Sequence, residues 1–305
     1  MLFVACFLIY FCLDLMPGDP ISYMVDQETW GEMTDVQKEA MREALGLNGT
    51  MIERFFKWLQ GVLHGDFGYS LTSGVPIRDI VLETLPATLE LSFSALFLSG
   101  VLGILLGVIS ALKRGRPIDH GLTIAGLLGM STPVFFFGLV SLLIFSINLG
   151  WFPIGGRMEV GNDTLVQRLH HLVLPATVLS LFLTASVMRY ARASMLDASS
   201  KDFLRTARSK GLPEWKVNFL HGFRVAMNPV VVQIGLRLPM LISGSVVVET
   251  VFQWPGIGRM FITAVRGQNY PLVMMIALLM ILTTMLSSFL IDLLTAAMDP
   301  RVRLE

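Results

Sequence analysis

The stretch Leu91–Leu112, LSFSALFLSGVLGILLGVISAL, decides the fold class of this chain. It runs for 22 positions without a charged side chain, and a helix needs about 20 apolar residues to cross roughly 30 Å of hydrocarbon. The stretch therefore predicts a transmembrane helix. Four further apolar runs are long enough for the same prediction: Leu122–Leu149, Leu172–Met188, Pro229–Phe252 and Leu272–Leu294.

A shorter apolar run, Leu2–Met16, lies at the start of the chain. As a helix it would extend about 22 Å. It has no basic flank before it and no small-residue cleavage site after it, so a signal peptide is disfavoured. We interpret it as a first membrane helix whose start is missing or lies at the terminus. The sequence thus predicts an all-α integral membrane protein with about six transmembrane helices, forming one transmembrane domain over residues 1–305.

The composition supports a membrane protein and excludes several other classes. The 305 residues are 53% hydrophobic and 15% charged, with 23 basic and 23 acidic side chains, whereas soluble domains carry about 25% charged residues. A disordered chain and a nucleic-acid binder with a basic surface are excluded. Cys6 and Cys12 lie on different faces of one apolar run, so neither a disulfide framework nor a metal site is expected.

The distribution of Lys and Arg predicts the orientation of the chain. Eight basic residues lie between the fourth and fifth predicted helices, within Arg189–Asn228, and three follow the second. By the positive-inside rule these segments are cytoplasmic, and so are both termini. Residues 17–86 would then form an extracytoplasmic insertion with eleven acidic and five basic residues. Within it, Asp35–Leu63 has an amphipathic helical pattern broken at Gly46 and Gly49.

Motifs for catalysis and metal binding are absent from the sequence. It contains no phosphate-binding loop, no His-Glu-x-x-His and no Gly-x-Ser-x-Gly elbow. His170 and His171 are adjacent, so they would point about 100° apart on a helix and are better read as interfacial residues than as metal ligands. Gly103 and Gly107 form a Gly-x-x-x-Gly pattern that predicts close helix packing. We expect no enzyme activity and no cofactor in this chain.

The cytoplasmic segment 189–228 has the signals of two short helices. Asp202–Gly211 reads as a helix with an acidic start and a glycine end. Pro213 then marks the start of a second helix, and Trp215 is of a type usually buried. A firm projection of this kind is typical of a docking element. The alternative is a basic loop that fixes topology and touches anionic lipid.

The stretch Arg205–Gly211, RTARSKG, resembles the coupling-loop motif of ABC importer permeases, in the form found in the peptide/nickel family. Other motifs of that family follow the same order along the chain: Pro17–Pro20, Gly65–Ser70, Leu85–Leu89, Val247–Gly258 and Asp299–Arg301. The resemblance covers Leu13 to Arg303 and is strongest to the first permease of a dipeptide or oligopeptide importer. Two departures are the missing basic segment before the first helix and Arg205, which stands where the general motif has an acidic residue.

The resemblance implies a transport function and a set of partners. The chain would pair with a second homologous permease, two cytoplasmic ATPases that bind ATP and Mg²⁺, and an extracytoplasmic solute-binding protein. Peptides would cross a bacterial or archaeal cell membrane by alternating access. Some residues are expected to couple the chain to the ATPases because they belong to the motif or to the predicted helices beside it. They are Asp202, Arg205, Thr206, Ala207, Gly211, Leu212 and Pro213.

Two further groups of residues are candidates for the transport path. Arg237 lies about 12 Å into the fifth predicted helix, where an arginine usually faces a cavity or a partner, so Arg237 and Ser243 are expected to line the path. The alternative places Arg237 at the inner headgroups. Trp254, Pro255 and Gly256 are expected to form an element at the outer mouth, the alternative being an ordinary interfacial tryptophan before a turn.

Three other functions remain open from the sequence. The same importer class could carry nickel chelates or oligosaccharides. An ion-coupled secondary transporter would show acidic residues near the midplane, whereas Asp14, Glu90, Glu249 and Asp292 fall near the ends of the predicted helices. An intramembrane enzyme would need a catalytic pair at membrane depth, which the sequence lacks.

Overall fold

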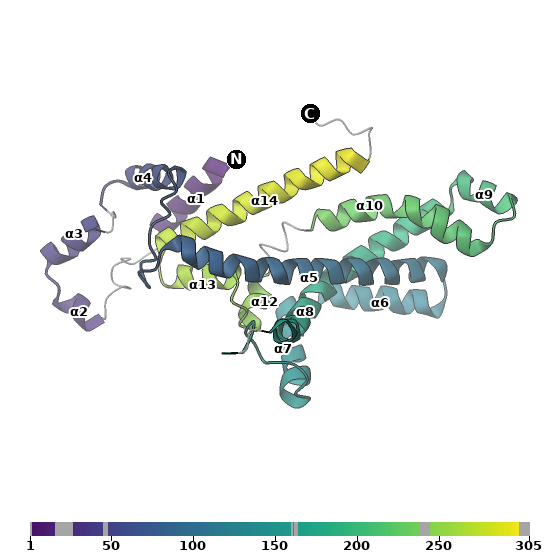
Figure 1. The fold of residues 1–305 in the computed structure, drawn as a ribbon, viewed down its shortest axis with the longest axis horizontal. Coiled ribbons are helices and arrows are strands. Elements are labelled where there is room, and N and C mark those ends of the chain that lie inside the picture. The colour runs from purple at the N-terminus through teal and green to yellow at the C-terminus, as the bar shows by residue number, and fades with distance from the viewer. Residues whose placement is uncertain are drawn as a thin grey trace. The chain divides into compact units, whose positions relative to one another are not determined.

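The computed structural model describes residues 2–15, 27–44, 48–159, 161, 164–237 and 245–298 (Figure 1). These residues form helices and connecting segments but no β-sheet, so the predicted all-α class is confirmed. The helices in chain order are α1 (Leu2–Asp14), α2 (Gln27–Glu32), α3 (Asp35–Ala44), α4 (Met51–Leu63), α5 (Ile77–Leu112), α6 (Pro117–Ser131), α7 (Val134–Ser141), η2 (Leu142–Asn148), α8 (Leu165–Ser199), α9 (Asp202–Ser209), η3 (Lys216–Gly222), α10 (Phe223–Gly235), α12 (Val246–Val251), α13 (Ile257–Arg266) and α14 (Tyr270–Met298).

The chain divides into two compact units. The first comprises Met1–Ala87 with Pro255–Thr283, and the second comprises Thr88–Trp254 with Thr284–Glu305. Helices α5 and α14 each contribute residues to both units. The predicted insertion, residues 17–86, falls within the first unit, and the expectation of a single transmembrane domain stays a prediction.

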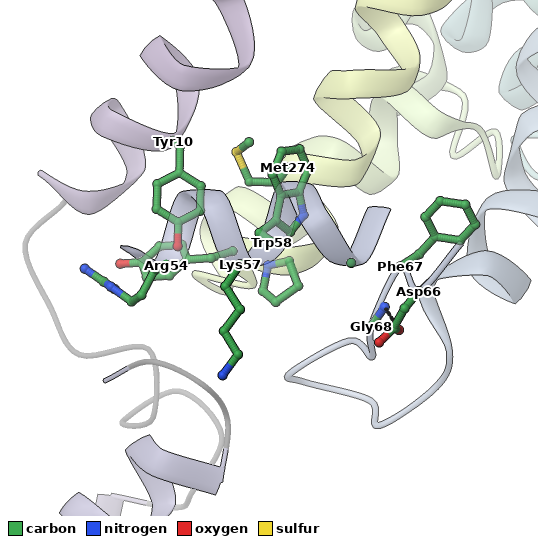
Figure 2. A pocket seen from close by; sticks show the side chains of 11 residues that line it. Tyr10, Arg54, Lys57, Trp58, Asp66, Phe67, Gly68 and Met274 are labelled. Atoms are coloured by element: carbon green, nitrogen blue, oxygen red, sulfur yellow. Dashed lines mark hydrogen bonds between the residues drawn. The ribbon is translucent and has the colours of Figure 1, made fainter. Parts of the chain in front are cut away.

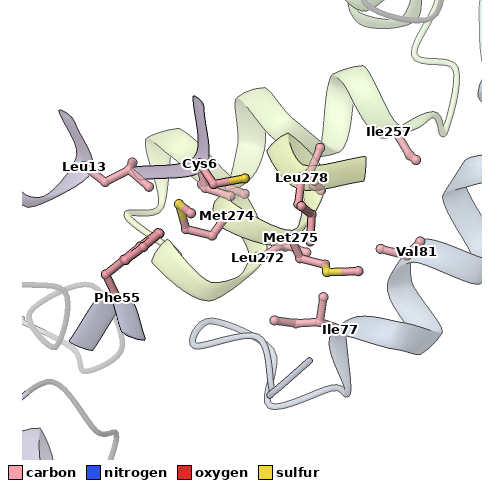
Figure 3. Packing of buried hydrophobic residues seen from close by; sticks show 13 residues of the cluster. Cys6, Leu13, Phe55, Ile77, Val81, Ile257, Leu272, Met274, Met275 and Leu278 are labelled. Atoms are coloured by element: carbon pink, nitrogen blue, oxygen red, sulfur yellow. The ribbon is translucent and has the colours of Figure 1, made fainter. Parts of the chain in front are cut away.

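The first unit is organised around Phe55 of α4. This helix begins with a capping box, in which the Thr50 amide donates to Glu53 Oε2 at 2.8 Å and the Glu53 amide donates to Thr50 Oγ1 at 3.4 Å. Phe55 is fully buried, and its ring centroid lies 5.2–5.5 Å from three rings of α1, those of Phe3, Phe7 and Tyr10. Residues of α5, α13 and α14 complete this apolar core (Figure 3).

The amphipathic pattern predicted over Asp35–Leu63 corresponds to two helices, α3 and α4. Gly49 lies between them with φ +99°, a left-handed conformation that favours glycine. The predicted break at this residue is confirmed, whereas Gly46 lies outside the described residues.

The second unit is held together by close contact between α5 and α8. A Cβ at Gly103 would lie 2.6 Å from the Cβ of Val187, and one at Gly107 would lie 2.6 Å from the Cβ of Ala191. Separations this short mean that both positions require glycine for the two helices to pack. The predicted packing role of the Gly-x-x-x-Gly pattern is therefore confirmed.

Among the described residues the long apolar helices are fewer than the predicted six, so that number stays a prediction. Three described helices are long and apolar enough to cross a membrane, within Ile77–Leu112, Leu165–Ser199 and Tyr270–Leu293, and a bent pair raises the number to four. The bend lies within the predicted third helix, where α6 and α7–η2 meet at 101°. Pro133 accounts for it, because proline disfavours a helical conformation at the preceding residue, and Thr132 is extended with φ −91° and ψ 130°.

The predicted fifth helix, Pro229–Phe252, is not a single helix among the described residues. Its first part belongs to α10, which begins earlier, at Phe223, and ends at Gly235. Its last part is α12, which has only six residues. The structure also extends α8 to Ser199, so the first part of the predicted cytoplasmic loop is helical.

Candidate coupling site and transport path

The segment that follows α8 is a helical hairpin with a small apolar core of its own. Leu204 and Ala207 lie three positions apart on α9 and are buried against Val217 of η3, with Leu212 packed at the edge. Residues three apart share a helix face, so α9 has one side fixed against the second arm. The predicted two-helix projection is present in the structure; its docking role stays a prediction.

The opposite face of α9 is exposed and polar. The side chains of Asp202 and Arg205 are 93% and 75% exposed, and they pair with each other at 3.6 Å. Thr206 is also exposed and donates to the Asp202 carbonyl at 3.1 Å. An exposed ion pair of this kind contributes little to stability, so this face is suited to recognition rather than to holding the fold.

The turn between the two arms is tightly specified. Gly211 adopts φ +77°, and its amide donates to the Arg208 carbonyl at 2.9 Å. Arg208 Nε also donates to Glu214 Oε1 at 2.9 Å, which joins the end of α9 to the start of the second arm. Pro213 begins that arm, because its carbonyl accepts from the Lys216 amide at 2.9 Å. A left-handed glycine and an N-terminal proline thus set the angle of the hairpin.

The second arm is one continuous helix rather than a short one. It is helical from residue 214, passes through η3 and runs on through α10 to Gly235. The expectation that Trp215 is buried is wrong, because its side chain is 62% exposed. The reason is helical geometry: Val217 occupies the buried side, and a residue two positions away points about 200° around the helix axis.

A buried acidic residue joins α6 to α8 near the end of α8. Asp119 of α6 is 3% exposed, and Arg192 of α8 donates to both of its carboxylate oxygens, from Nε at 2.7 Å and from NH2 at 2.8 Å. The Ser110 hydroxyl donates to Oδ1, and the Gly115 amide donates to Oδ2 at 3.0 Å. Bidentate arginine pairs of this type have a defined orientation. The cluster therefore fixes the α5–α6 turn to α8, seven residues before α8 ends.

A second buried carboxylate lies in α12. Glu249 is fully buried, and its Oε1 accepts from Thr88 Oγ1 of α5 at 2.8 Å and from Ser245 Oγ at 2.7 Å. The Trp254 amide donates to the Glu249 carbonyl at 2.8 Å, and the Trp254 indole is fully buried. Glu249 thus joins the short helix α12 to α5 and holds the start of the turn that follows α12.

The remaining outer-mouth residues lead into α13. Gly256 is the N-cap of that helix, directly after Pro255. Both belong to the first compact unit, whereas Trp254 belongs to the second. The predicted outer-mouth role of these three residues stays a prediction, and the burial of the indole means that any role of Trp254 acts through packing of the turn.

The loop after η2 is anchored to the second unit by another ion pair. Arg157 donates to Glu90 Oε2 of α5 from both Nε, at 2.8 Å, and NH2. The Gly156 amide donates to the Phe252 carbonyl at 2.9 Å, beside the end of α12. This loop therefore contacts both α5 and α12.

Of the two residues predicted to line the transport path, the structure describes only Arg237. Arg237 lies just after α10 and is partly buried, and its NH2 donates to Ser186 Oγ of α8 at 2.8 Å. Ser186 is a buried residue on the long apolar helix α8, so the guanidinium is turned toward the helix bundle. Ser243 lies outside the described residues. The assignment of either residue to a path stays a prediction.

The adjacent histidines bind separate carbonyl groups rather than a common centre. His170 Nε2 lies 2.8 Å from the Trp151 carbonyl, and His171 Nδ1 lies 3.2 Å from the Gly156 carbonyl. In the part of the chain that the structure describes, no group of three or more His, Cys, Asp or Glu side chains is placed to hold a metal ion.

Sequence reasoning missed the pairs Asp119–Arg192 and Glu90–Arg157. In the sequence, Arg192 and Arg157 enter only the count of basic residues in the loops, which predicts the orientation of the chain in the membrane. A signal was present, since an acidic residue beside an apolar run needs a partner when it is buried. The partner itself has no local signature, because the two members of each pair are 73 and 67 positions apart.

The chain is similar to a known family of transport proteins. The family model "Binding-protein-dependent transport system inner membrane component" matches residues 103–304. The oligopeptide transport system permease protein AppB of Bacillus subtilis is 38% identical, with 94% of this chain and 90% of that protein covered. The dipeptide transport system permease protein DppB of Escherichia coli (strain K12) is 34% identical, with 95% and 91% covered.

Solved structures show the same fold at lower sequence identity. An inward-facing structure of the MetNI methionine ABC transporter matches with a TM-score of 0.60 at 16% identity, covering 73% of this chain and 98% of that one. A structure of an amino acid ABC transporter with histidines matches with a TM-score of 0.53 at 19% identity, covering 72% and 94%.

Proposed function

Because the chain belongs to the inner-membrane permease components of binding-protein-dependent transport systems and is a permease subunit of an ABC importer, we propose that its substrates are dipeptides or oligopeptides. The observation that carries this proposal is the similarity to peptide permeases over 94–95% of the chain. Such a length includes most of the segment before residue 103, which lies outside the family model.

We further propose how the chain is assembled. It pairs with a second homologous permease, and two ATPases that bind ATP and Mg²⁺ dock from the cytoplasm. A solute-binding protein delivers the peptide to the extracytoplasmic side. The chain lies in the cell membrane with both termini in the cytoplasm, which agrees with the excess of Lys and Arg in the α9 hairpin.

The hairpin provides the proposed contact with the ATPases. Its polar exposed face, centred on Arg205 and Asp202, meets the ATPase, and its apolar core around Leu204 keeps the two arms together. A motion of the ATPases then moves the whole hairpin, and the bundle exchanges inward-facing and outward-facing states. Coupling requires such a rigid element, because a flexible loop would not transmit a difference in binding energy.

The experiment that tests this function changes Gly211 in the complete transporter. A Cβ added at Gly211 meets no atom within 4 Å, so we expect the effect of Gly211→Val to come from the left-handed φ of +77°, which costs a residue with a Cβ about 1 kcal/mol or more. We expect uptake of a radiolabelled dipeptide and substrate-stimulated ATP hydrolysis to fall together, at an unchanged amount of complex in the membrane.

Two control variants make the result specific. Gly74→Val has the same strain at φ +68° with open space, but lies in the first unit, so it should leave coupling unchanged. Gly211→Asn should retain most activity, because asparagine tolerates the left-handed region. Wild-type uptake and wild-type stimulation of ATP hydrolysis in Gly211→Val would contradict the role of the hairpin. If the wild-type transporter hydrolyses ATP but takes up no dipeptide, the proposed peptide substrate is wrong.

A further inference from the structure

A cavity of about 220 Å³ lies within the first unit and has no place in the transport mechanism described above. Its walls come from α1, α4, the turn after α4 and the first turn of α14 (Figure 2). Three of its aromatic side chains are Tyr10, Trp58 and Tyr270. Aromatic residues of this type gather where apolar helices leave the membrane, and the cavity lies at the end of the apolar helix α1 and the start of the apolar helix α14.

Two hydrogen-bond donors in the wall of the cavity have no acceptor among the described residues. Arg54, Lys57 and Trp58 lie at i, i+3 and i+4 on α4, so they share one face and line the cavity. The Nε of Arg54 and the Nε1 of Trp58 are both buried and have no acceptor among the described residues. A buried donor without a partner costs about 1–3 kcal/mol, so a small shift of the two side chains that brings these atoms to an acceptor in the cavity would be favourable.

The charges at the cavity are balanced. Arg54 pairs with Asp14 at the end of α1, and Lys57 extends from the α4 side (Figure 2). Asp66 lies across the cavity from Lys57, with its Oδ1 accepting from the Gly68 amide at 3.0 Å. Two cations and two anions favour a ligand that carries both signs of charge over a purely anionic one.

The surface beside the cavity is apolar and exposed. On α1, Val4 and Leu8 are exposed, and on α4 Ile52 and Phe56 are exposed although the helix is amphipathic. A helix with exposed apolar side chains beside cationic ones is typical of one that lies in the membrane interface. Acyl chains therefore have a surface next to the cavity, and the cavity itself is smaller than the roughly 300–1,000 Å³ of sites that enclose a whole ligand.

We propose that this cavity binds the headgroup of a zwitterionic phospholipid. The phosphate oxygens accept from Lys57, Arg54 and the indole of Trp58, and the ammonium faces Asp66. The acyl chains remain outside, along α1 and α4. The bound lipid would hold α4 against α1 and the start of α14, in the unit that contains the extracytoplasmic insertion.

The test measures phospholipids retained by the complete purified transporter, by native mass spectrometry after reconstitution in nanodiscs of phosphatidylethanolamine and phosphatidylglycerol. Loss of one charged hydrogen bond corresponds to about a tenfold weaker affinity. We expect Lys57→Ala to lower retention of phosphatidylethanolamine by about that factor, and Trp58→Phe, which keeps an aromatic ring but removes the pyrrole part of the indole with its N–H, to lower it less. Lys38→Ala, whose Nζ lies over the ring of Trp30 outside the cavity, should have no effect.

A second comparison tests the zwitterionic assignment. Asp66→Asn should abolish the preference for phosphatidylethanolamine over phosphatidylglycerol, whereas Asp79→Asn, an exposed position on α5, should keep it. Equal retention in wild type, Lys57→Ala and Trp58→Phe would overturn the proposal. Displacement of the lipid by millimolar inorganic phosphate or dipeptide would also overturn it, since the site would then belong to a soluble ligand.

Discussion

Two arginine–carboxylate pairs lie beside α5, and they hold their carboxylates in different ways. At Asp119, Arg192 donates to both oxygens, and a hydroxyl and a backbone amide add two further bonds. At Glu90, both donor atoms of Arg157 converge on the same oxygen, Oε2. The side chain of Asp119 is 4% exposed and that of Glu90 is 25% exposed.

The difference indicates which contacts are fixed and which can be released during transport. A carboxylate held on both oxygens by residues of helices has one orientation, and breaking the pair leaves a buried charge. A carboxylate held on one oxygen by a loop residue can rotate, and water can replace the lost bond. We infer that the Asp119 pair stays closed through the transport cycle, whereas the Glu90 pair opens when the loop carrying Arg157 moves.

Removing the arginine of the fixed pair should have the largest effect. Arg192→Ala leaves Asp119 charged and buried, so we expect a loss of about 3 kcal/mol in unfolding free energy, measured by chemical unfolding of the purified complex in micelles. Arg189→Ala removes an exposed arginine three positions earlier on the same helix and should change stability by less than about 0.5 kcal/mol. The double variant Asp119→Leu with Arg192→Met should recover most of the loss. An equal loss in Arg189→Ala and Arg192→Ala would show that the pair is not a special contact.

Removing the arginine of the second pair should have a smaller effect on stability. Because Glu90 is partly exposed, Arg157→Ala should cost about 1 kcal/mol. Lysine substitutions sharpen the contrast, since an ammonium can satisfy one oxygen but cannot reproduce a fork that binds two. Arg157→Lys should therefore be close to wild type in the same unfolding assay, and Arg192→Lys should not. Equal tolerance of lysine at both positions would remove the distinction between the pairs.

The smallest expected effect is at Arg237, which tests a third arrangement, a guanidinium bound to the Ser186 hydroxyl. If this residue offers a transient partner to the carboxylate of a passing peptide, Arg237→Ala should reduce uptake of peptides with a free C-terminus by about threefold, which corresponds to about 0.6 kcal/mol. Uptake of the same peptides with an amidated C-terminus should fall less. An equal reduction for both peptides, at equal expression, would exclude the carboxylate role.

Local signals in the sequence predicted the coupling hairpin well. An acidic first turn, a glycine at the end of α9 and a proline before the next helix each act over a few residues, and Gly211 has the left-handed φ that this pattern requires. The Gly103 and Gly107 pattern likewise predicted a close packing that α8 provides. The all-α membrane class followed from the lengths of the apolar runs, with the composition in support.

The features that sequence reasoning missed depend on the folded state. A single helix was predicted over Leu122–Leu149 because the apolar run is long, and no break was predicted at Pro133. In the structure the helix is broken at this proline. Trp215 was expected to be buried from its residue type, but its position on the helix relative to Val217 decides its exposure. Asp119 pairs with Arg192, which lies 73 positions away in the sequence. Only the folded chain brings residues so far apart in the sequence together.

The continuity of the helix from residue 214 to Gly235 makes the second arm of the hairpin a lever. Its length is roughly 33 Å at 1.5 Å per residue, so a tilt of about 10° at the hairpin would displace the far end by roughly 6 Å. The far end is where Arg237 contacts α8. A small angular motion imposed on α9 would thus be converted into a translation of several ångströms at the contact between Arg237 and α8, less whatever bending occurs at the π-helical segment η3 or at Pro229.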